Sequence, residues 1–140
     1  MSPALLDVNV LLALAWPNHQ HHAAAHQWFF RDARQGWATC ALTELAFVRL
    51  SSNPAYTPAA VSPSEAAALL RKLVAHKRHR FWAELPAVTA DALAKAAGHQ
   101  QVIDAYLVHL ASYHRGRVVT FDVPLRAHAS DPGLVHVIAS

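Results

Sequence analysis

The sequence predicts an α/β fold, in which helices cover both faces of a mostly parallel central sheet. Short apolar segments typical of strands alternate with longer segments of helical periodicity along the chain. In the first such pair, the stretch from Leu5 to Leu12, an apolar strand passes directly into an apolar helix. No internal repeat, low-complexity segment or linker interrupts the alternation. Residues 1–140 are therefore expected to form one domain of this class.

The first half of the chain is expected to alternate strands and helices twice and then to begin a further helix. We predict strands at Ala4–Leu6 and Trp37–Cys40 and helices at Val8–Trp16, His19–Ala33 and Leu42–Leu50. The next helix should begin after Ser62, because Ser62 can cap it, Pro63 suits its first position and Glu65 completes a capping box. It should end at about Ala75.

The second half of the chain is expected to continue the alternation. We predict a short strand or extended segment at Phe81–Leu85, helices at Ala90–Ala97 and Gln101–His114, and strands at Arg117–Phe121 and Val135–Ile138. Thr89 is placed to cap the first of these helices, and Gly98 to end it. Connections between parallel strands should be right-handed crossovers, which places helices on both faces of the sheet.

Composition indicates a compact protein with a modest excess of positive charge. Hydrophobic residues make up 54% of the chain and charged residues 15%, which favours a folded core over a disordered chain. No apolar run is long enough to cross a bilayer and no signal-peptide pattern opens the chain, so we expect a cytoplasmic protein without a membrane partner. The single cysteine, Cys40, is expected to be a small buried hydrophobe. A net charge of +3 with only nine acids favours a polyanionic partner.

Four acids occupy positions that the predicted sheet would bring to one pocket. Asp7 and Asp122 each follow a strand, and Glu44 lies in the first turn of the helix after the second strand. Asp104 lies among apolar neighbours, near the start of the helix that precedes the strand ending at Asp122. The carboxyl ends of parallel strands share one edge, where ligands collect. Taken singly, Asp7 or Asn9 could equally be a helix cap, and each other acid a cap or a surface charge.

Carboxylates gathered in one pocket require a cation, because their mutual repulsion raises pKa values and destabilises the fold. Oxygen ligands from Asp and Glu favour Mg²⁺ or Mn²⁺ over Zn²⁺. A divalent ion beside a moderately basic surface suggests hydrolysis of phosphodiester bonds, with the ion activating water and offsetting charge on the transition state. One carboxylate would orient the water or accept its proton, and the sequence leaves open which one.

Four short motifs, taken in order, resemble those of the PIN-domain ribonucleases. They are Leu5-Leu6-Asp7-Val8-Asn9, Ala38-Thr39-Cys40-Ala41-Leu42-Thr43-Glu44-Leu45 with Arg49, Asp104-Ala105-Tyr106-Leu107 and Val118-Val119-Thr120-Phe121-Asp122. Among these ribonucleases the sequence looks most like the VapC toxins of bacterial toxin–antitoxin systems, and the likeness spans Leu5 to about Ile138. Each motif alone is weak, whereas the ordered set is specific.

The resemblance implies a three-layer PIN-like domain with a four-carboxylate site. The catalytic set that it implies is Asp7, Glu44, Asp104 and Asp122; the metal ligands are Asp7, Asp104 and Asp122; the supporting residues are Asn9, Thr43 and Thr120. It further implies an Mg²⁺- or Mn²⁺-dependent endoribonuclease that takes RNA as its substrate. Such a toxin would form a homodimer and would be held inactive by a cognate antitoxin protein.

Basic and histidine-rich segments outside the acidic set have two interpretations each. The possible RNA contacts are Arg49, Arg78, Arg80 and Arg115. Such residues would contact phosphate whatever the base sequence, or they are solvated surface charges and helix ends. Four histidines between His19 and His26 include a pair, His22 and His26, whose helical spacing could hold a transition metal. A solvated face or a contact to RNA phosphate is the alternative, and the role of this cluster is open.

Two other functions are compatible with the same pattern of acids. A catalytically silent RNA- or protein-binding module of this fold would bind RNA without a metal and would cleave nothing. A metal-dependent phosphatase also begins with a strand followed by acids, but the haloacid-dehalogenase pattern needs a second Asp where this chain has Asn9. The residues do not identify which RNA is cut or where, which antitoxin binds, or how many metal ions are held.

Overall fold

A parallel sheet lies at the centre of the structure. Within residues 2–140, which the computed structural model describes, five strands pair in the order β3-β2-β1-β4-β5. They are β1 (Ala4–Leu6), β2 (Trp37–Cys40), β3 (His79–Trp82), β4 (Arg117–Thr120) and β5 (Val135–Val137). All neighbouring pairs are parallel. The α/β class predicted from the alternation of strands and helices is confirmed.

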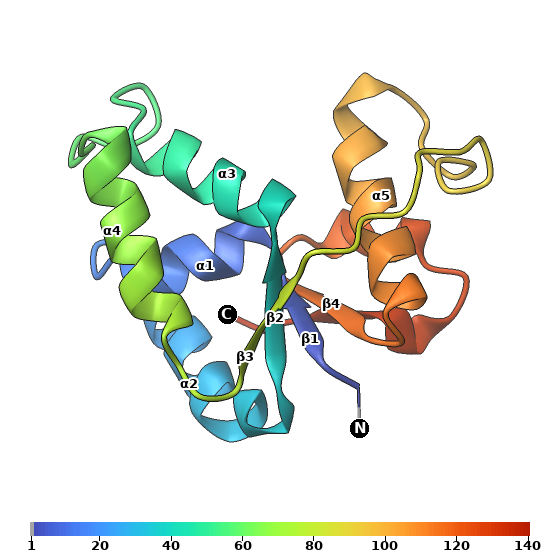
Figure 1. Cartoon of the computed structure of the whole chain (residues 1–140), viewed down its shortest axis with the longest axis horizontal. Helices are drawn as coiled ribbons and strands as arrows, with labels where there is room; N and C mark the ends of the chain where they lie inside the picture. Colours follow the sequence, from blue (N-terminus) through green and yellow to red (C-terminus); the bar gives the residue numbers. More distant parts are fainter. Residues whose placement is uncertain (1) are drawn as a thin grey trace.

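Helices cover both faces of this sheet and give three layers (Figure 1). They are α1 (Val8–Ala15), α2 (His22–Asp32), α3 (Ala41–Ser51), α4 (Pro63–Val74) and α5 (Val102–Tyr113). The first four lie on one face, and α5 lies on the other. Short 3₁₀ segments occur at Ala33–Gln35, His99–Gln101, Val123–His128 and Pro132–Leu134. Each helix in residues 2–140 is too short or too polar to cross a membrane.

Strand side chains alternate between two hydrophobic cores, one on each face of the sheet. In β1, Ala4 and Leu6 pack in the core under α1 to α4, whereas Leu5 packs in the core under α5. In β2, Trp37 packs in the core under α1 to α4, and Ala38 packs in the core under α5. All five side chains are fully buried. A sheet covered on both faces needs no polar face, which explains why these strands read as continuous apolar runs.

The order of the strands reverses between β1 and β4. From β1 the chain passes through α1 and α2 to β2, and then through α3 and α4 to β3, on one side of the sheet. It returns through α5 to β4, on the other side of β1. In open α/β sheets, ligands bind at such a switch point, outside the carboxyl ends of the strands. Asp7 directly follows β1 and Asp122 lies two residues after β4, so both acids lie at this point.

Most of the predicted elements are confirmed, with small differences at their ends. The capping box at the start of α4 is present, because the Glu65 amide bonds Oγ of Ser62 at 3.2 Å and the Ser62 amide bonds Oε1 of Glu65 at 3.1 Å. Cys40 is a free, fully buried side chain, as expected.

Strand β3 begins two residues before the predicted segment Phe81–Leu85 and ends at Trp82. Its register with β2 explains the difference, because the pairs run from Trp37 opposite His79 to Cys40 opposite Trp82. Strand β2 ends at Cys40, where α3 begins, so the chain after Trp82 has no β2 residue to pair with. The predicted segment is therefore strand only in its first two residues.

The helix predicted at Ala90–Ala97 is wrong, because this segment forms hydrogen-bonded turns. Thr89 does act as a cap, its Oγ1 accepting from the Ala92 amide at 3.2 Å. The backbone bonds that follow join residues three apart, as in turns, and not four apart. Only Ala92 of the segment is buried. A short helix needs an apolar face packed on its neighbours to offset the entropy of ordering, and an alanine-rich composition alone does not supply one.

Gly116 is a position where the fold leaves no room for a side chain. A Cβ there would lie 2.6 Å from the carbonyl oxygen of Pro3 and 2.9 Å from Cη2 of Trp82. We expect Gly116→Ala to lower the free energy of unfolding by about 1–3 kcal/mol, because backbone and ring must shift. Gly98→Ala is the control, since nothing lies within 4 Å of the Cβ that it adds. Urea unfolding of both variants is the measurement, and equal midpoints would contradict this steric explanation.

Candidate active site

One hydroxyl group links the two strands at the switch point. Thr120, the last residue of β4, donates from Oγ1 to Oδ2 of Asp7 at 2.8 Å. The same oxygen accepts from Nδ2 of Asn9 at 3.2 Å and from the backbone amide of Asp122 at 3.0 Å. A hydroxyl has one hydrogen to donate and two lone pairs, so every position is used. Thr120 is fully buried and holds Asp7, Asn9 and the chain at Asp122 in one arrangement.

Asp7 and Asn9 join the start of α1 to this arrangement. Asp7 is the N-cap of α1, and its Oδ1 accepts from the Val8 amide at 2.8 Å. Oδ1 of Asn9 accepts from the Phe121 amide at 3.3 Å, while its Nδ2 bonds Thr120. Asp7 therefore does cap a helix, which is one of the two roles that its position in the sequence allows.

Three aspartates influence one another at this edge of the sheet. Burial raises the pKa of Asp7 from its ordinary 3.8 to about 6, hydrogen bonds from Thr120 and Val8 oppose this shift, and the charges of Asp104 and Asp122 add to it. Burial, and then the charge of Asp122, also raises the pKa of Asp104. In residues 2–140 no basic side chain forms an ion pair with any of the three. Asp7, Asp104 and Asp122 therefore form a group of acids whose charge the chain itself does not offset.

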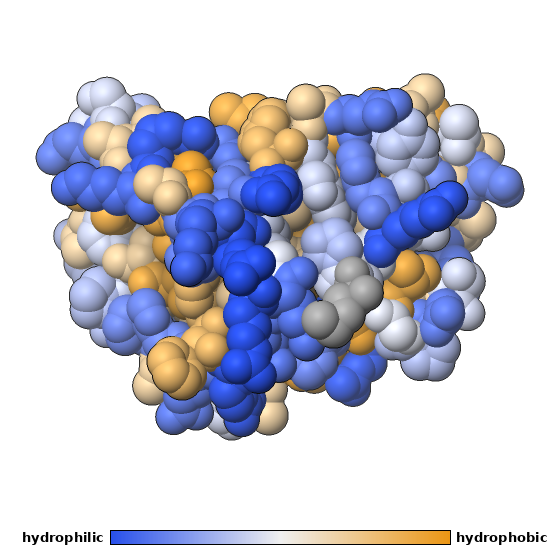
Figure 2. Space-filling view, turned by 60° about the horizontal axis from the view of Figure 1, so that its bottom comes forward, coloured by the Kyte–Doolittle hydropathy of each residue, from blue (hydrophilic) through white to orange (hydrophobic). Residues whose placement is uncertain are grey.

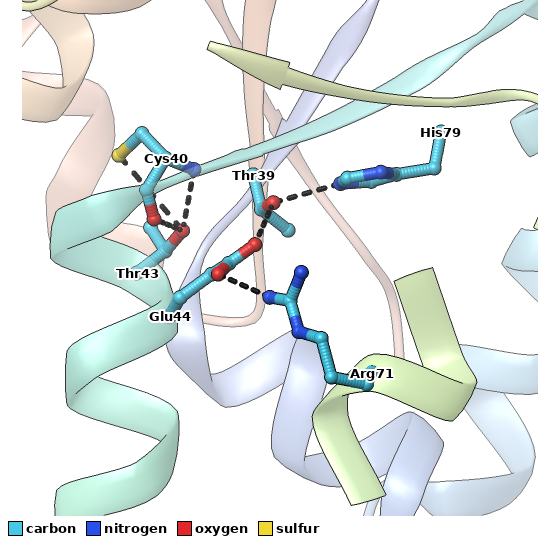
Figure 3. A network of polar contacts seen from close by, with 6 residues as sticks. All are labelled: Thr39, Cys40, Thr43, Glu44, Arg71 and His79. Carbon is cyan, nitrogen blue, oxygen red and sulfur yellow. Dashed lines mark hydrogen bonds and ion pairs between the residues drawn. The ribbon is translucent and has the colours of Figure 1, made fainter. Parts of the chain in front are cut away.

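Glu44 belongs to a separate polar network between α3, α4 and β3 (Figure 3). Its Oε2 accepts from Oγ1 of Thr39 at 2.7 Å, and its Oε1 forms an ion pair with Arg71 of α4. The side chain of Glu44 is 14% exposed and that of Arg71 is 59% exposed. Nε2 of His79 lies 2.7 Å from Oγ1 of Thr39. Because the single hydroxyl hydrogen of Thr39 goes to Glu44, the His79 nitrogen must be the donor in this contact.

The structure thus brings together part of the predicted set. The residues gathered at the switch point are Asp7, Asn9, Asp104, Thr120 and Asp122. Glu44 is not among the charges that shift the pKa of Asp7 or of Asp104. As the side chains stand, no three His, Cys, Asp or Glu residues between positions 2 and 140 are arranged to share one metal ion.

Thr43 supports the start of α3 and does not bond to an acid. Its Oγ1 accepts from the Cys40 amide and donates to the Cys40 carbonyl oxygen, each at 3.1 Å. Both residues are buried. Thr43 therefore holds the first helical turn, which carries Glu44, and Figure 3 shows the two side by side.

The chemistry of the three aspartates fits a hard divalent cation. Carboxylate oxygens are the preferred ligands of Mg²⁺ and Mn²⁺. A cation among them would replace repulsion by attraction, and so would lower the pKa values that burial raises in Asp7 and Asp104. The one cysteine, Cys40, is free and fully buried. The side chains suited to such an ion are therefore Asp7, Asp104 and Asp122.

The other three residues of the Glu44 network carry little signal in the sequence. Thr39 has one local signal, because it is the only hydroxyl-bearing residue in the apolar strand β2. Arg71 lies 27 residues from Glu44, and His79 lies 40 residues from Thr39. Only the packing of α4 and β3 against α3 and β2 brings them together, so these contacts become visible in the folded chain alone.

Two histidines of the predicted cluster bond to the end of α1. Nδ1 of His22 lies 2.7 Å from the carbonyl oxygen of Ala13, and Nε2 of His26 lies 2.9 Å from that of Leu14. The last carbonyl groups of a helix have no partner within it, so these rings satisfy them. No metal-binding group of three includes them in the described part of the chain. Their role is therefore to stabilise the end of α1.

The arginines predicted to contact RNA are all exposed but do not lie together. Arg80 is on the edge strand β3 and Arg78 directly precedes it, while Arg115 lies between α5 and β4. Arg78 and Arg115 are thus near the amino ends of the strands, at the edge opposite the aspartates. Arg49 is in the last turn of α3. Figure 2 shows a band of strongly hydrophilic residues down one face of the molecule.

Comparison with known families agrees with this fold. A family model described as PIN domain matches residues 4–130, so the chain belongs to the PIN domain family. The match runs from β1 past β4, and it therefore includes the acids at both strands of the switch point.

Individual relatives show which group within the PIN domain family the chain belongs to. Ribonuclease VapC39 of Mycobacterium tuberculosis is 44% identical over 138 residues, which cover 96% of this chain and 99% of the relative. Ribonuclease VapC38 of the same organism is 47% identical over 119 residues, covering 85% of this chain and 84% of the relative. Ribonuclease VapC44 is 42% identical over 122 residues, covering 85% of each. Within the PIN domain family the chain is thus one of the VapC proteins, as its four ordered motifs predict.

Asp7 should make the stability of the metal-free protein depend on pH. Its pKa is about 6 in the folded chain against 3.8 ordinarily, so the folded state holds the proton more tightly than the unfolded state does. The contribution of Asp7 to stability is therefore full below about pH 4 and is lost as the pH rises through about 6. As the pH rises from about 4 to above 6, the free energy of unfolding of Asp7→Asn should increase relative to that of wild type by up to about 3 kcal/mol, because asparagine does not ionise.

Urea unfolding in EDTA across this pH range is the measurement for Asp7. Asp91→Asn removes an acid from the exposed segment before α5 and should follow the wild-type curve. A constant difference in unfolding free energy between wild type and Asp7→Asn at all pH values would show that the Asp7 pKa is not raised.

Proposed function

We propose that this protein is a metal-dependent endoribonuclease and the toxin component of a VapBC-type toxin–antitoxin system. The observation that carries the proposal is the group of three aspartates, without a basic partner in residues 2–140, at the switch point of a PIN-domain sheet. The relatives named above as ribonucleases support RNA as the substrate. The ion would be Mg²⁺ or Mn²⁺, with Asp7, Asp104 and Asp122 as its ligands.

The chain's own residues then divide the work of the reaction. Thr120 and Val8 hold the two oxygens of Asp7, so this carboxylate is a fixed anchor. The Asp104 side chain has no hydrogen bond within residues 2–140, so its carboxylate is free to orient a water molecule or to accept its proton. The chemistry supplied by a bound divalent cation is activation of water and stabilisation of charge on the phosphodiester. Glu44 completes the proposed catalytic set from the first turn of α3.

Cleavage of RNA is the direct test of the proposed function. The purified protein, free of antitoxin, should cut total cellular RNA into discrete fragments with Mg²⁺ or Mn²⁺ and should leave it intact in EDTA. Asp7→Asn and Asp104→Asn should each lower the rate by at least about 100-fold, because each removes a charged ligand of the cation that would stabilise charge on the reacting phosphate. Asp91→Asn, which removes an exposed acid elsewhere, should cut like wild type.

A catalytically silent RNA-binding module is the competing function. It is favoured by one observation, namely that the acids in residues 2–140 do not converge on one metal position as they stand. That module would bind RNA equally well with and without EDTA and would cleave nothing. Fragments that appear in the presence of EDTA, or that persist in Asp7→Asn, would contradict the proposed metal site.

The proposed partners are RNA, a cognate antitoxin and a second copy of the chain in the cytoplasm. An apolar groove of about 440 Å³ between α3, α5 and the start of α4 supports the homodimer. Leu45 and Ile103 line this groove and are 66% and 54% exposed. A two-fold interface must be self-complementary, and a groove with projecting apolar side chains on its own rim meets that condition.

Leu45→Glu should convert the dimer to a monomer, because a charge would then have to be buried against the groove. Light scattering coupled to gel filtration gives the mass directly. Phe30→Glu is the matched control, since Phe30 is 87% exposed on α2 and is flanked there by polar His26, Gln27 and Arg31. A wild-type protein of monomeric mass, or a Leu45→Glu protein that stays dimeric, would exclude this groove as the dimer interface.

A further inference from the structure

Other side chains of the chain hold both carboxylate oxygens of Glu44. Thr39 donates to Oε2, and Arg71 pairs with Oε1 from the neighbouring helix α4 (Figure 3). This is the one ion pair found in residues 2–140. Glu44 lies in the first turn of α3, which begins where β2 ends, just as Asp7 lies where the neighbouring strand β1 ends. The first turn of α3 is therefore at the same edge of the sheet as the aspartates, while the carboxylate of Glu44 is held on the α4 side.

Two arrangements compete for the Glu44 carboxylate. In the observed one, the positive charge of Arg71 offsets its negative charge. In the other, it would join three aspartates whose charges already disfavour ionisation of Asp7 and Asp104, and a fourth negative charge there is unfavourable. A divalent cation among the aspartates reverses this balance, because it attracts every carboxylate near it. The ion pair can then break at little cost, since Arg71 is more than half exposed and such pairs are weak.

We propose that Arg71 is a positioning residue that holds Glu44 on the α4 side until a divalent cation offsets the three aspartates, and that Glu44 then joins the metal site. This inference rests on the proposed function, because it requires the metal site to exist. The exchange has a thermodynamic consequence. The Glu44–Arg71 pair must break for Glu44 to join the site, so the pair lowers the apparent affinity for the cation.

Arg71 is the mobile partner of Glu44, whereas Thr39, whose hydrogen bond Glu44 must also leave, is fixed. Thr39 is fully buried, and it receives a hydrogen bond from His79 while it donates to Glu44. The His79 ring in turn packs against Trp37, with ring centroids 4.7 Å apart. The Arg71 side chain has no such packing constraint, since more than half of it lies in solvent.

Affinity for Mn²⁺ alone, without RNA, tests this exchange. Free Mn²⁺ measured by electron paramagnetic resonance gives the dissociation constant for each variant. Arg71→Met should bind Mn²⁺ about fivefold more tightly than wild type, because the competing ion pair is gone. Arg71→Lys keeps the charge and should stay close to wild type. Lys72→Met removes the same charge from the next, equally exposed position without touching Glu44, and should also bind as wild type does.

A second background separates the ion pair from a general effect of charge. In Glu44→Gln the carboxylate is absent, so adding Arg71→Met should change the Mn²⁺ affinity no more than adding Lys72→Met does. An equal increase from Arg71→Met in both backgrounds would overturn the proposal, and so would an unchanged affinity in Arg71→Met alone. Thermal unfolding of each variant checks that the fold is intact, which is expected because Arg71 and Lys72 are both exposed.

The same titrations distinguish failure of this inference from failure of the proposed function. If wild type binds no Mn²⁺, or if Asp7→Asn binds it as tightly, the metal site itself is wrong and the exchange falls with it. If binding requires Asp7 but is insensitive to Arg71, only the positioning role is wrong. Tighter binding in Arg71→Met that depends on Glu44 supports both.

Discussion

The geometry of the site depends on the hydroxyl group of Thr120. Its single hydrogen and both lone pairs are used, and the three partners come from the start of α1 and from the chain beyond β4. Because the group is fully buried, rotating it would leave a polar atom without a partner, at a cost of about 1–3 kcal/mol. The bond to Asp7 joins residues 113 positions apart in the sequence. Asp7 is therefore positioned by the two central strands, β1 and β4, and not by a flexible loop.

Electrostatics divides the predicted acids into two groups of different character. Burial opposes ionisation of Asp7 and Asp104, and no basic residue in the described chain is paired with them. Glu44 lies in the first turn of α3, directly after β2, and has both Thr39 and Arg71 as partners. One group is thus neutralised internally, while the other has no basic side chain of residues 2–140 paired with it. A fold that keeps uncompensated acids in this way gives up some stability for function.

What could be predicted from the sequence was local in character, and what could not was long-range. Asp7 and Asp122 were identifiable because each directly follows an apolar strand, and parallel strands share their carboxyl edge. The position of Glu44 was equally visible, but its orientation toward Arg71 depends on how α4 packs on α3. The incorrect helix at Ala90–Ala97 has the same cause, since its sequence favours a helix but the fold gives it almost no surface to pack on.

The irregular segment 83–98 links β3 to the 3₁₀ turn before α5 without contributing any hydrogen bond to the acids. It is attached to α5 instead, where Tyr106 donates to the Pro86 carbonyl oxygen and Tyr113 donates to Glu84. Its length and sequence can therefore change without disturbing the hydrogen bonds that hold Asp7 and Asn9. A scaffold of this kind can carry different rims around the same arrangement of acids, which is one route by which a single fold serves different targets.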